Sequence, residues 1–475
     1  MSDLPEDNDL AIDPANSRRL FSLGCVIVLS AVVCIWWSSP LTDPLQLLAG
    51  LSIVVLGCVP GLLWARNRNP WFPCFEISTF TCVVFYGIPL LTGHDELKAY
   101  PETVIQLSGF LVVAYLLAAI AAFNSVKVTA KAPRWAAIKL LPDNLHRYLP
   151  AGLLLNTAYL YLDRFTTLIP YEFLGSLRAL FFGLGTITAF ILSCDWGRGR
   201  LSPNIKILFG VCLLTQSIIS FSHLYLISGM SLLILSAIGY TTTRRRLPWL
   251  VMALCLPVVA VLHNGKSQMR ERYWNPVKQL PPVTELVDFY EQWFEFGLQK
   301  SDRADSPNLA AKLAERASLF QMLCMSASKV PEQQPYLGGE SYVDIPAQVI
   351  PRLLWPDKPS SLMSNIRLAV YFNLIDPDTP FATSIAFGVL AEAYINFGVL
   401  GVLVLGVFTG LGFKHVVLRS VSVPLFSAIG IFVILLTAWS FQAEQTMATW
   451  LSSLFQACVI CIGLPLVCKK LFGDT

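Results

Sequence analysis

The sequence predicts an all-α polytopic membrane protein with about twelve transmembrane helices. Hydrophobic residues make up 55% of the 475 residues and charged residues only 14%, whereas a soluble domain usually carries about 25% charged residues. So few charges could not cover the surface of this chain in water, and we therefore expect the bilayer to be its solvent. Apolar runs of bilayer length recur along the chain, and Lys and Arg gather in alternate connections between them.

Each expected span is a run of roughly 20 predominantly apolar residues. The candidates lie near 20–38, 45–65, 71–92, 105–123, 149–169, 173–193, 207–222, 223–240, 248–263, 384–412, 424–442 and 448–468. The segments at 207–222 and 223–240 are short and nearly continuous. We expect five segments in order: a cytoplasmic tail (1–19), a bundle of about nine helices (20–263), a large extracytoplasmic loop with short amphipathic helices (264–380), about three further helices (381–468) and a second cytoplasmic tail (469–475).

The distribution of positive charge predicts the orientation, because Lys and Arg concentrate in cytoplasmic loops. With the N-terminus inside, the short outer loops hold only Lys98. The inner segments hold Arg18, Arg19, Arg66, Arg68, Lys127, Lys131, Arg134, Lys139, Arg147, Arg198, Arg200, Lys206, Arg244, Arg245, Arg246, Lys414, Arg419, Lys469 and Lys470. Both termini are therefore expected in the cytoplasm. Residues 1–17 are polar and acidic and no cleavage site follows the first apolar run, so we expect no signal peptide.

The large outer loop has the composition of an ordered segment, because it is rich in Trp and Phe. Residues 283–300 place Leu286, Phe289, Trp293 and Phe296 at helical spacing, which suits a helix lying at the membrane interface. Gly338 and Gly339 predict a turn.

Ionisable residues at membrane depth are candidates for function. Arg164 and Arg178 are expected at similar depth near the outer face, where either could bind a phosphate or could instead pair with Asp163 or Glu172. Lys266 and Arg270 follow the ninth span on the outer side, where positive charge runs against the positive-inside rule. Either they bind something anionic at that surface, or their side chains simply extend to the interface. Glu392 lies about 12 Å into the tenth span, close in sequence to Tyr394 and Asn396, and this favours a polar cavity. Glu444 is expected to meet water at the end of the eleventh span.

No motif for a metal, a nucleotide or a serine nucleophile is present, and the chain has only five His residues. Most of the 12 Cys residues lie in apolar runs, where they behave as small apolar side chains. We expect no metal and no cofactor.

Three segments occur in order: GGESY at 338–342, IPRLLWPDKP at 350–359 and EAYINFGVLG at 392–401. Together they resemble the Wzy-type O-antigen and oligosaccharide repeat-unit polymerases. The pattern of spans, with one large loop late in the chain, resembles that family over the whole length. The resemblance implies a GT-C-like polymerase architecture in the bacterial cytoplasmic (inner) membrane, with the active site facing the periplasm or exterior.

The resemblance also implies a reaction, in which a glycan on undecaprenyl pyrophosphate is transferred to a second lipid-linked repeat unit and the lipid pyrophosphate leaves. Cations must stabilise the leaving group, and a base should accept the hydroxyl proton. The expected catalytic residues are Arg352, Glu392, Lys358 and Glu340. The expected pyrophosphate-binding residues are Arg164, Arg178, Lys266, Arg270 and Arg316. The expected glycan-binding residues are Trp355, Tyr342, Tyr394 and Asn396. Arg352 and Lys358 could instead pack on Trp355 or pair with Asp357.

The implied partners are the lipid-linked donor and acceptor, membrane lipids, a chain-length regulator and a flippase, and no nucleic acid is expected. Three alternatives stay open. An O-antigen ligase-like enzyme would use the same donor and a different acceptor. A metal-dependent polyprenyl-phosphate-sugar transferase would place acids in the first outer loop, which holds only Asp43. A lipid-linked glycan flippase or transporter would often show an internal repeat, and we find none.

Overall fold

The computed structural model describes residues 13–67, 72–93, 95–126, 133–137, 139–140, 147–169, 171–274, 280–299, 319–350, 355, 357–375, 385–421 and 423–472. The first half contains α1 (Pro14–Ser38), α2 (Pro44–Arg66), α3 (Cys74–Cys82), the π-helix η1 (Val83–Gly87), α4 (Ile88–Leu91), the 3-10 helix η2 (Asp95–Ala99), α5 (Glu102–Ser125), α6 (Arg134–Ala137), α7 (Leu149–Phe165), α8 (Tyr171–Gly197), α9 (Pro203–Phe221) and α10 (Leu226–Arg244). The second half contains α11 (Trp249–Trp274), the 3-10 helix η4 (Val283–Glu285), α12 (Leu286–Leu298), α14 (Leu319–Lys329), the 3-10 helix η5 (Glu340–Tyr342), α15 (Ile345–Gln348), α16 (Met363–Tyr371), α17 (Gly388–Ser420), α18 (Ala428–Trp439), α19 (Met447–Cys458), the π-helix η6 (Val459–Gly463) and α20 (Leu464–Phe472).

The all-α membrane character predicted from composition is confirmed. Within the described ranges, nine helical segments are long and apolar enough to cross a bilayer. The predicted spans at 149–169, 223–240 and 424–442 coincide with three further helices, α7, α10 and α18. The nearly continuous pair of predicted spans forms two helices, because α9 ends at Phe221 and α10 begins at Leu226. The total of about twelve crossings stays a prediction.

Several helices begin where a capping residue is followed by proline. The Asp13 carboxylate accepts a hydrogen bond from Ala15 N (2.9 Å), and the Asp43 carboxylate accepts one from Leu45 N (2.8 Å). In both cases a proline occupies the first helical position, where its fixed φ fits the helix and its missing N–H costs nothing. These sequence signals set where α1 and α2 enter the bundle.

α17 packs closely along α5 because two glycines face that helix. A Cβ atom on Gly406 would lie 2.7 Å from Tyr115 O, and one on Gly410 would collide with Ala119 O. Small residues four positions apart allow two helix backbones to approach within a membrane. This contact fixes the position of α17, which carries Glu392 near its N-terminal end.

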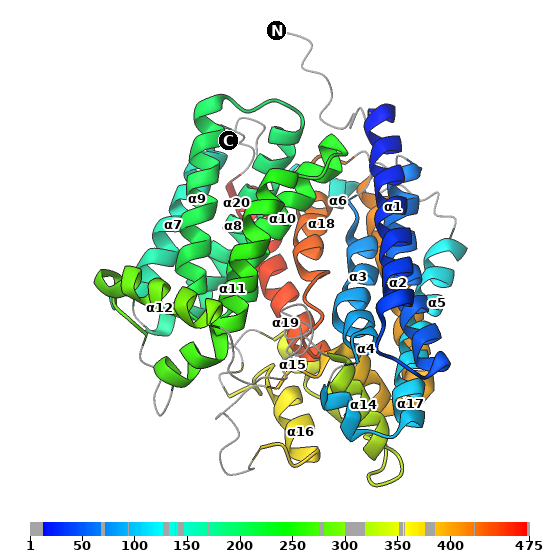
Figure 1. Cartoon of the computed structure of the whole chain (residues 1–475). Coiled ribbons are helices and arrows are strands. Elements are labelled where there is room, and N and C mark those ends of the chain that lie inside the picture. The colour runs from blue at the N-terminus through cyan, green and yellow to red at the C-terminus, as the bar shows by residue number, and fades with distance from the viewer. Residues whose placement is uncertain are drawn as a thin grey trace.

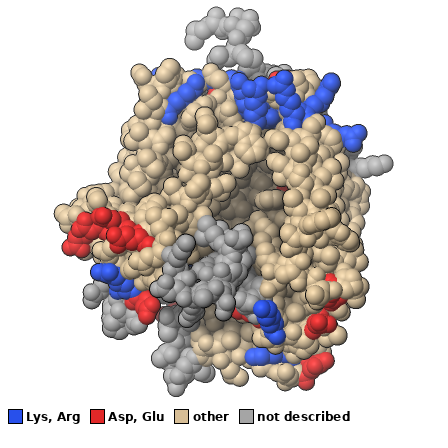
Figure 2. Space-filling model, viewed as in Figure 1, with Lys and Arg blue, Asp and Glu red and all other residues tan. Residues whose placement is uncertain are grey.

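Three helices of the large loop, α14, α15 and α16, lie at the end of the bundle opposite the start of α1 and α20 (Figure 1). α12 lies apart from them, beside α11 (Figure 1). Lys and Arg side chains line the end at which α1 begins, and a broad uncharged band follows (Figure 2). An uncharged belt of this kind suits contact with lipid.

The predicted helix at 283–300 is present as α12, and its apolar face packs on protein. Phe289 and Trp293 are fully buried in a cluster with Leu262 and Met269 of α11, and Trp293 Nε1 donates to Leu262 O (2.6 Å). The interface position expected from its amphipathic pattern is therefore replaced, for these two rings, by docking onto α11. The predicted glycine turn is also present, with φ of 58° at Gly338 and 102° at Gly339.

Candidate functional site

The loop at 337–342 is bound to a break in α17. Gly398 departs from helical geometry (φ 62°, ψ −146°), and a break of this kind releases backbone carbonyls from the preceding turn. Backbone N–H groups of the loop replace the helical N–H groups as hydrogen-bond donors at this break. The bonds run from Leu337 N to Ile395 O (3.1 Å), from Gly338 N to Asn396 O (3.1 Å) and from Gly339 N to Asn396 Oδ1 (3.0 Å). The first and third segments of the family resemblance therefore meet in space.

Glu392 lies at the centre of this junction and is completely buried. Ser341 Oγ donates to Glu392 Oε1 (2.8 Å), and Met447 N donates to Oε2 (2.7 Å). Met447 is the first residue of α19, so the carboxylate lies at a helix N-terminus, which favours negative charge. Asn396 Nδ2 donates to Ser341 Oγ (2.8 Å) and to Glu392 O (2.8 Å). Glu392 thus joins the loop, α17 and α19, and both of its oxygens are occupied.

The other expected residues near the junction have different environments. Tyr342 is half-buried and stacks on Phe397 with ring centroids 6.3 Å apart, and burial, with a contribution from Glu392, raises the pKa of Tyr342. Tyr394 is buried and donates to Val330 O (3.2 Å). Glu340 is exposed. Tyr342 and Glu340 therefore retain accessible surface beside the junction.

Lys358 is buried, and its ammonium group is held by backbone carbonyls. Lys358 Nζ donates to Ile350 O (2.7 Å), Gln348 O (3.3 Å) and Ala347 O (3.4 Å). A cation at the C-terminal end of α15 satisfies carbonyls that the helix leaves free. Trp355 is 42% exposed. Arg352, the third member of this segment, lies outside the described residues.

Sequence reasoning missed the contribution of Arg367 in α16. Arg367 forms an ion pair with Asp344 (2.9 Å) and donates to Glu340 O (3.2 Å). It therefore holds the loop through contacts separate from those of Glu392. Its partner is 23 positions away in an irregular segment, and no sequence periodicity links the two.

Two of the arginines expected to bind pyrophosphate, Arg164 and Arg270, contact the turn between α9 and α10. Arg164 donates to Ser222 Oγ (2.9 Å) and to Pro281 O (3.0 Å), and Arg270 donates to Leu224 O (3.0 Å). Arg178 pairs with Asp163 (3.1 Å), which is the alternative left open by the sequence. These contacts lie at the C-terminal ends of α7, α9 and α11. Arg316 lies outside the described residues.

The turn between α18 and α19 brings a further carboxylate toward α11. Glu444 is exposed, as expected, yet the surrounding protein removes enough water to raise its pKa, against the opposing effect of Lys266 and Arg270. Lys266 and Arg270 are four residues apart on one face of α11. Both of these expected cations therefore act electrostatically on a carboxylate that follows the C-terminal end of α18.

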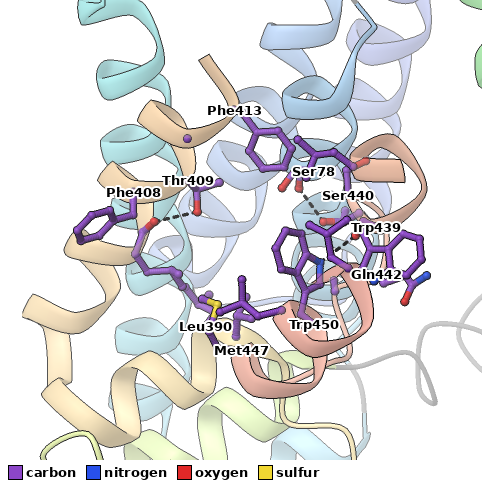
Figure 3. Close-up of a pocket in the computed structure, with 18 of the residues that line it drawn as sticks. Ser78, Leu390, Phe408, Thr409, Phe413, Trp439, Ser440, Gln442, Met447 and Trp450 are labelled. Carbon is purple, nitrogen blue, oxygen red and sulfur yellow. Dashed lines mark hydrogen bonds between the residues drawn. The ribbon is translucent and has the colours of Figure 1, made fainter. Parts of the chain in front are cut away.

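An apolar cavity of about 380 Å³ extends between α3, α5, α17, α18 and α19. Trp439 and Trp450 face Phe408 and Thr409 across this space, and Met447 lies at its edge (Figure 3). Because Met447 also supplies the N–H that binds Glu392, the cavity adjoins the polar junction. Within the part of the chain that the structure describes, His, Cys, Asp and Glu form no group of three or more that could hold a metal ion.

Comparisons with known proteins identify a family without a known activity. No curated protein matches the chain, and no solved structure matches it. A family profile described as "Domain of unknown function (DUF8712)" matches residues 153–442. The matched range runs from α7 to the turn after α18 and includes the loop and the Glu392 junction. The chain therefore belongs to the DUF8712 family.

Proposed function

We propose that this protein is a membrane glycosyltransferase that polymerises polyprenyl-pyrophosphate-linked oligosaccharide repeat units at the outer face of a bacterial cytoplasmic membrane. The proposal rests on one observation above the others. The apolar cavity and the polar junction around Glu392 share Met447, so a lipid-sized space adjoins a polar site. A substrate with a polyprenyl chain and a hydrophilic head group needs both environments side by side.

The cavity suits the lipid part of such a substrate. Its lining is mostly Leu, Val, Phe and Trp, with few polar groups, and binding sites of this volume typically bury apolar ligands. α17 contributes residues from Val389 to Val416 to the lining, so the space follows the direction of the helix. An isoprenoid chain would therefore lie along α17 with its head group toward Glu392.

The chemistry requires positive charge where the pyrophosphate leaves. Lys266 and Arg270 are cations on the side of the molecule that the charge distribution places outside. Preorganised cations stabilise a leaving pyrophosphate strongly in a site with little water. Arg164 supports them indirectly, because it and Arg270 hold the same α9–α10 turn.

Glu392 acts in this scheme by holding the site together. Its oxygens accept bonds from Ser341 and Met447 and the side chain has no exposed surface, so a substrate hydroxyl could reach it only if the junction opened. Its role is to fix the loop at 338–342 against the start of α19, next to the cavity. Tyr342, Glu340 and Trp355 then offer accessible surface for sugar rings and hydroxyl groups.

The test is the length of lipid-linked glycans in a deletion strain that carries the wild type, Lys266→Ala or the outer-loop control Lys98→Ala. The wild type and Lys98→Ala should restore long polymers. Lys266→Ala should leave mainly single repeat units on the outer face, with the protein at normal abundance. Single units trapped on the cytoplasmic face of the deletion strain would contradict the proposal in favour of a transporter. Normal polymers in that strain, with single units not joined to their final acceptor, would favour a ligase.

A further inference from the structure

Glu444 occupies the turn that closes one end of the apolar cavity. Ala443 and Met447, on either side of it in sequence, both line that space, and so do Trp439 and Gln442 earlier in the turn. Glu444 itself retains exposed surface. The turn that carries Glu444 therefore borders the cavity, close to where a head group would emerge from a lipid chain bound inside.

The same carboxylate faces two cations on another element. Lys266 and Arg270 both act electrostatically on Glu444, and their spacing places them one above the other on α11. The two cations are thus close enough to Glu444 to act on it, beside the turn that borders the cavity. In such a position the cations can bind a pyrophosphate while the carboxylate stays close to the sugar attached to it.

Glu392 and Glu444 differ in what they can do. Glu392 has no exposed surface and accepts a hydrogen bond at each oxygen from within the protein, so a ligand cannot reach it unless the junction opens. Glu444 is open to a ligand, and its net pKa is raised by the loss of surrounding water. A carboxylate with a raised pKa is a stronger base, and is better matched to proton transfer near neutral pH.

We propose that Glu444 is the catalytic base of the reaction, and this inference rests on the function proposed above. The acceptor hydroxyl oxygen forms a bond to the anomeric carbon of the donor sugar. The bond from that carbon to the pyrophosphate oxygen breaks, and its electron pair leaves with the lipid pyrophosphate, which Lys266 and Arg270 stabilise. The hydroxyl proton passes to the Glu444 carboxylate. Glu392 is a positioning residue in this scheme.

The experiment uses the full-length protein in detergent micelles with a synthetic lipid-linked repeat unit as both donor and acceptor. Glu444→Gln keeps the size of the side chain and removes the base, and we expect kcat to fall by about 10²- to 10⁴-fold. Binding of undecaprenyl pyrophosphate should stay the same or tighten, because a negative charge beside Lys266 and Arg270 is lost. Glu291→Gln, at an exposed position on α12, is the matched control and should retain the wild-type rate.

A Glu444→Gln protein with a kcat close to that of the wild type would overturn the inference, and so would weaker pyrophosphate binding with an unchanged kcat. If Glu444→Gln proves unstable in thermal unfolding, Glu444→Asp is used instead, because it keeps the charge and shortens the side chain by one methylene. This variant should lower kcat by at least tenfold and should bind undecaprenyl pyrophosphate as the wild type does. A wild-type-like rate in that variant would also overturn it. A wild type that makes no elongated product would refute the proposed polymerase function itself, and the two failures are therefore distinguishable.

Discussion

Replacing Glu392 by alanine should release the loop at 337–342 from α17. The change removes the acceptor of two buried donors, Ser341 Oγ and Met447 N. Hydrogen bonds to a charged group contribute about 1.5–3 kcal/mol each, so the local loss is about 3–6 kcal/mol if neither donor finds a new partner. Water entering the vacated space would restore part of this, which makes the lower end the expected value.

Hydrogen exchange measures this loss at the right place. The backbone N–H groups of Leu337, Gly338 and Gly339 are protected by Ile395 and Asn396 of α17. A loss of about 3 kcal/mol in local stability corresponds to roughly 100-fold faster exchange of these amides, since about 1.4 kcal/mol is tenfold. Amides of α5 should exchange at their normal rate, because the helix contact through Gly406 and Gly410 is untouched.

The matched control is Glu332→Ala, which removes an exposed carboxylate from the turn between α14 and this loop. Exchange in the control should equal that of the wild type throughout. If exchange at 337–339 is unchanged in Glu392→Ala, the loop is held by its backbone bonds and by Arg367 alone. The central position given to Glu392 would then be wrong.

Three further changes test other parts of the structure. Gly410→Ala should lower the Tm because its Cβ would collide with Ala119 O, whereas Gly412→Ala, with open space around its Cβ, should leave the Tm unchanged; equal Tm values would argue against the close α5–α17 contact. Lys358→Met should lower the Tm by a few degrees, because the carbonyls at the end of α15 lose a charged donor, and an unaltered Tm would show that this bonding is dispensable. Ala443→Trp should fill the rim of the cavity and raise the KM for a long-chain lipid-linked donor at least tenfold while a short-chain donor is used normally; an equal KM for both donors would count against the cavity as the lipid site.

The sequence predicts the helices well, because each is encoded locally. Apolar length alone identifies spans such as 45–65, and an acid followed by proline marks where α2 begins. The paired glycines at 338–339 predict a turn because few other residues adopt positive φ. Even the helical spacing in 283–300 is correct. The spacing does not show what the apolar side of this helix contacts. A helix that packs on protein and a helix that lies at a lipid interface have the same apolar stripe.

The candidate site is harder to predict, because its contacts join positions far apart in the chain. Glu392 binds Ser341 and Met447, 51 and 55 positions away, and Arg164 reaches Pro281 across 117 positions. Residue type suggests that each of these side chains needs a partner, but several partners satisfy the same chemistry. The family resemblance brings two of the segments together as motifs without indicating that Ser341 would be the residue that joins them.

The two glutamates show why accessibility has to be known before a role is assigned. By depth in the membrane, Glu392 is the stronger candidate for chemistry, and Glu444 is a carboxylate that simply meets water. The structure supports the opposite assignment of roles. Both oxygens of Glu392 hold protein segments together. Glu444 stays exposed beside a cavity and two cations. Membrane burial selects for a carboxylate with internal partners, whereas a base needs an oxygen that the substrate hydroxyl can reach. A buried carboxylate in a polytopic enzyme is therefore more informative about what positions the site than about what reacts there.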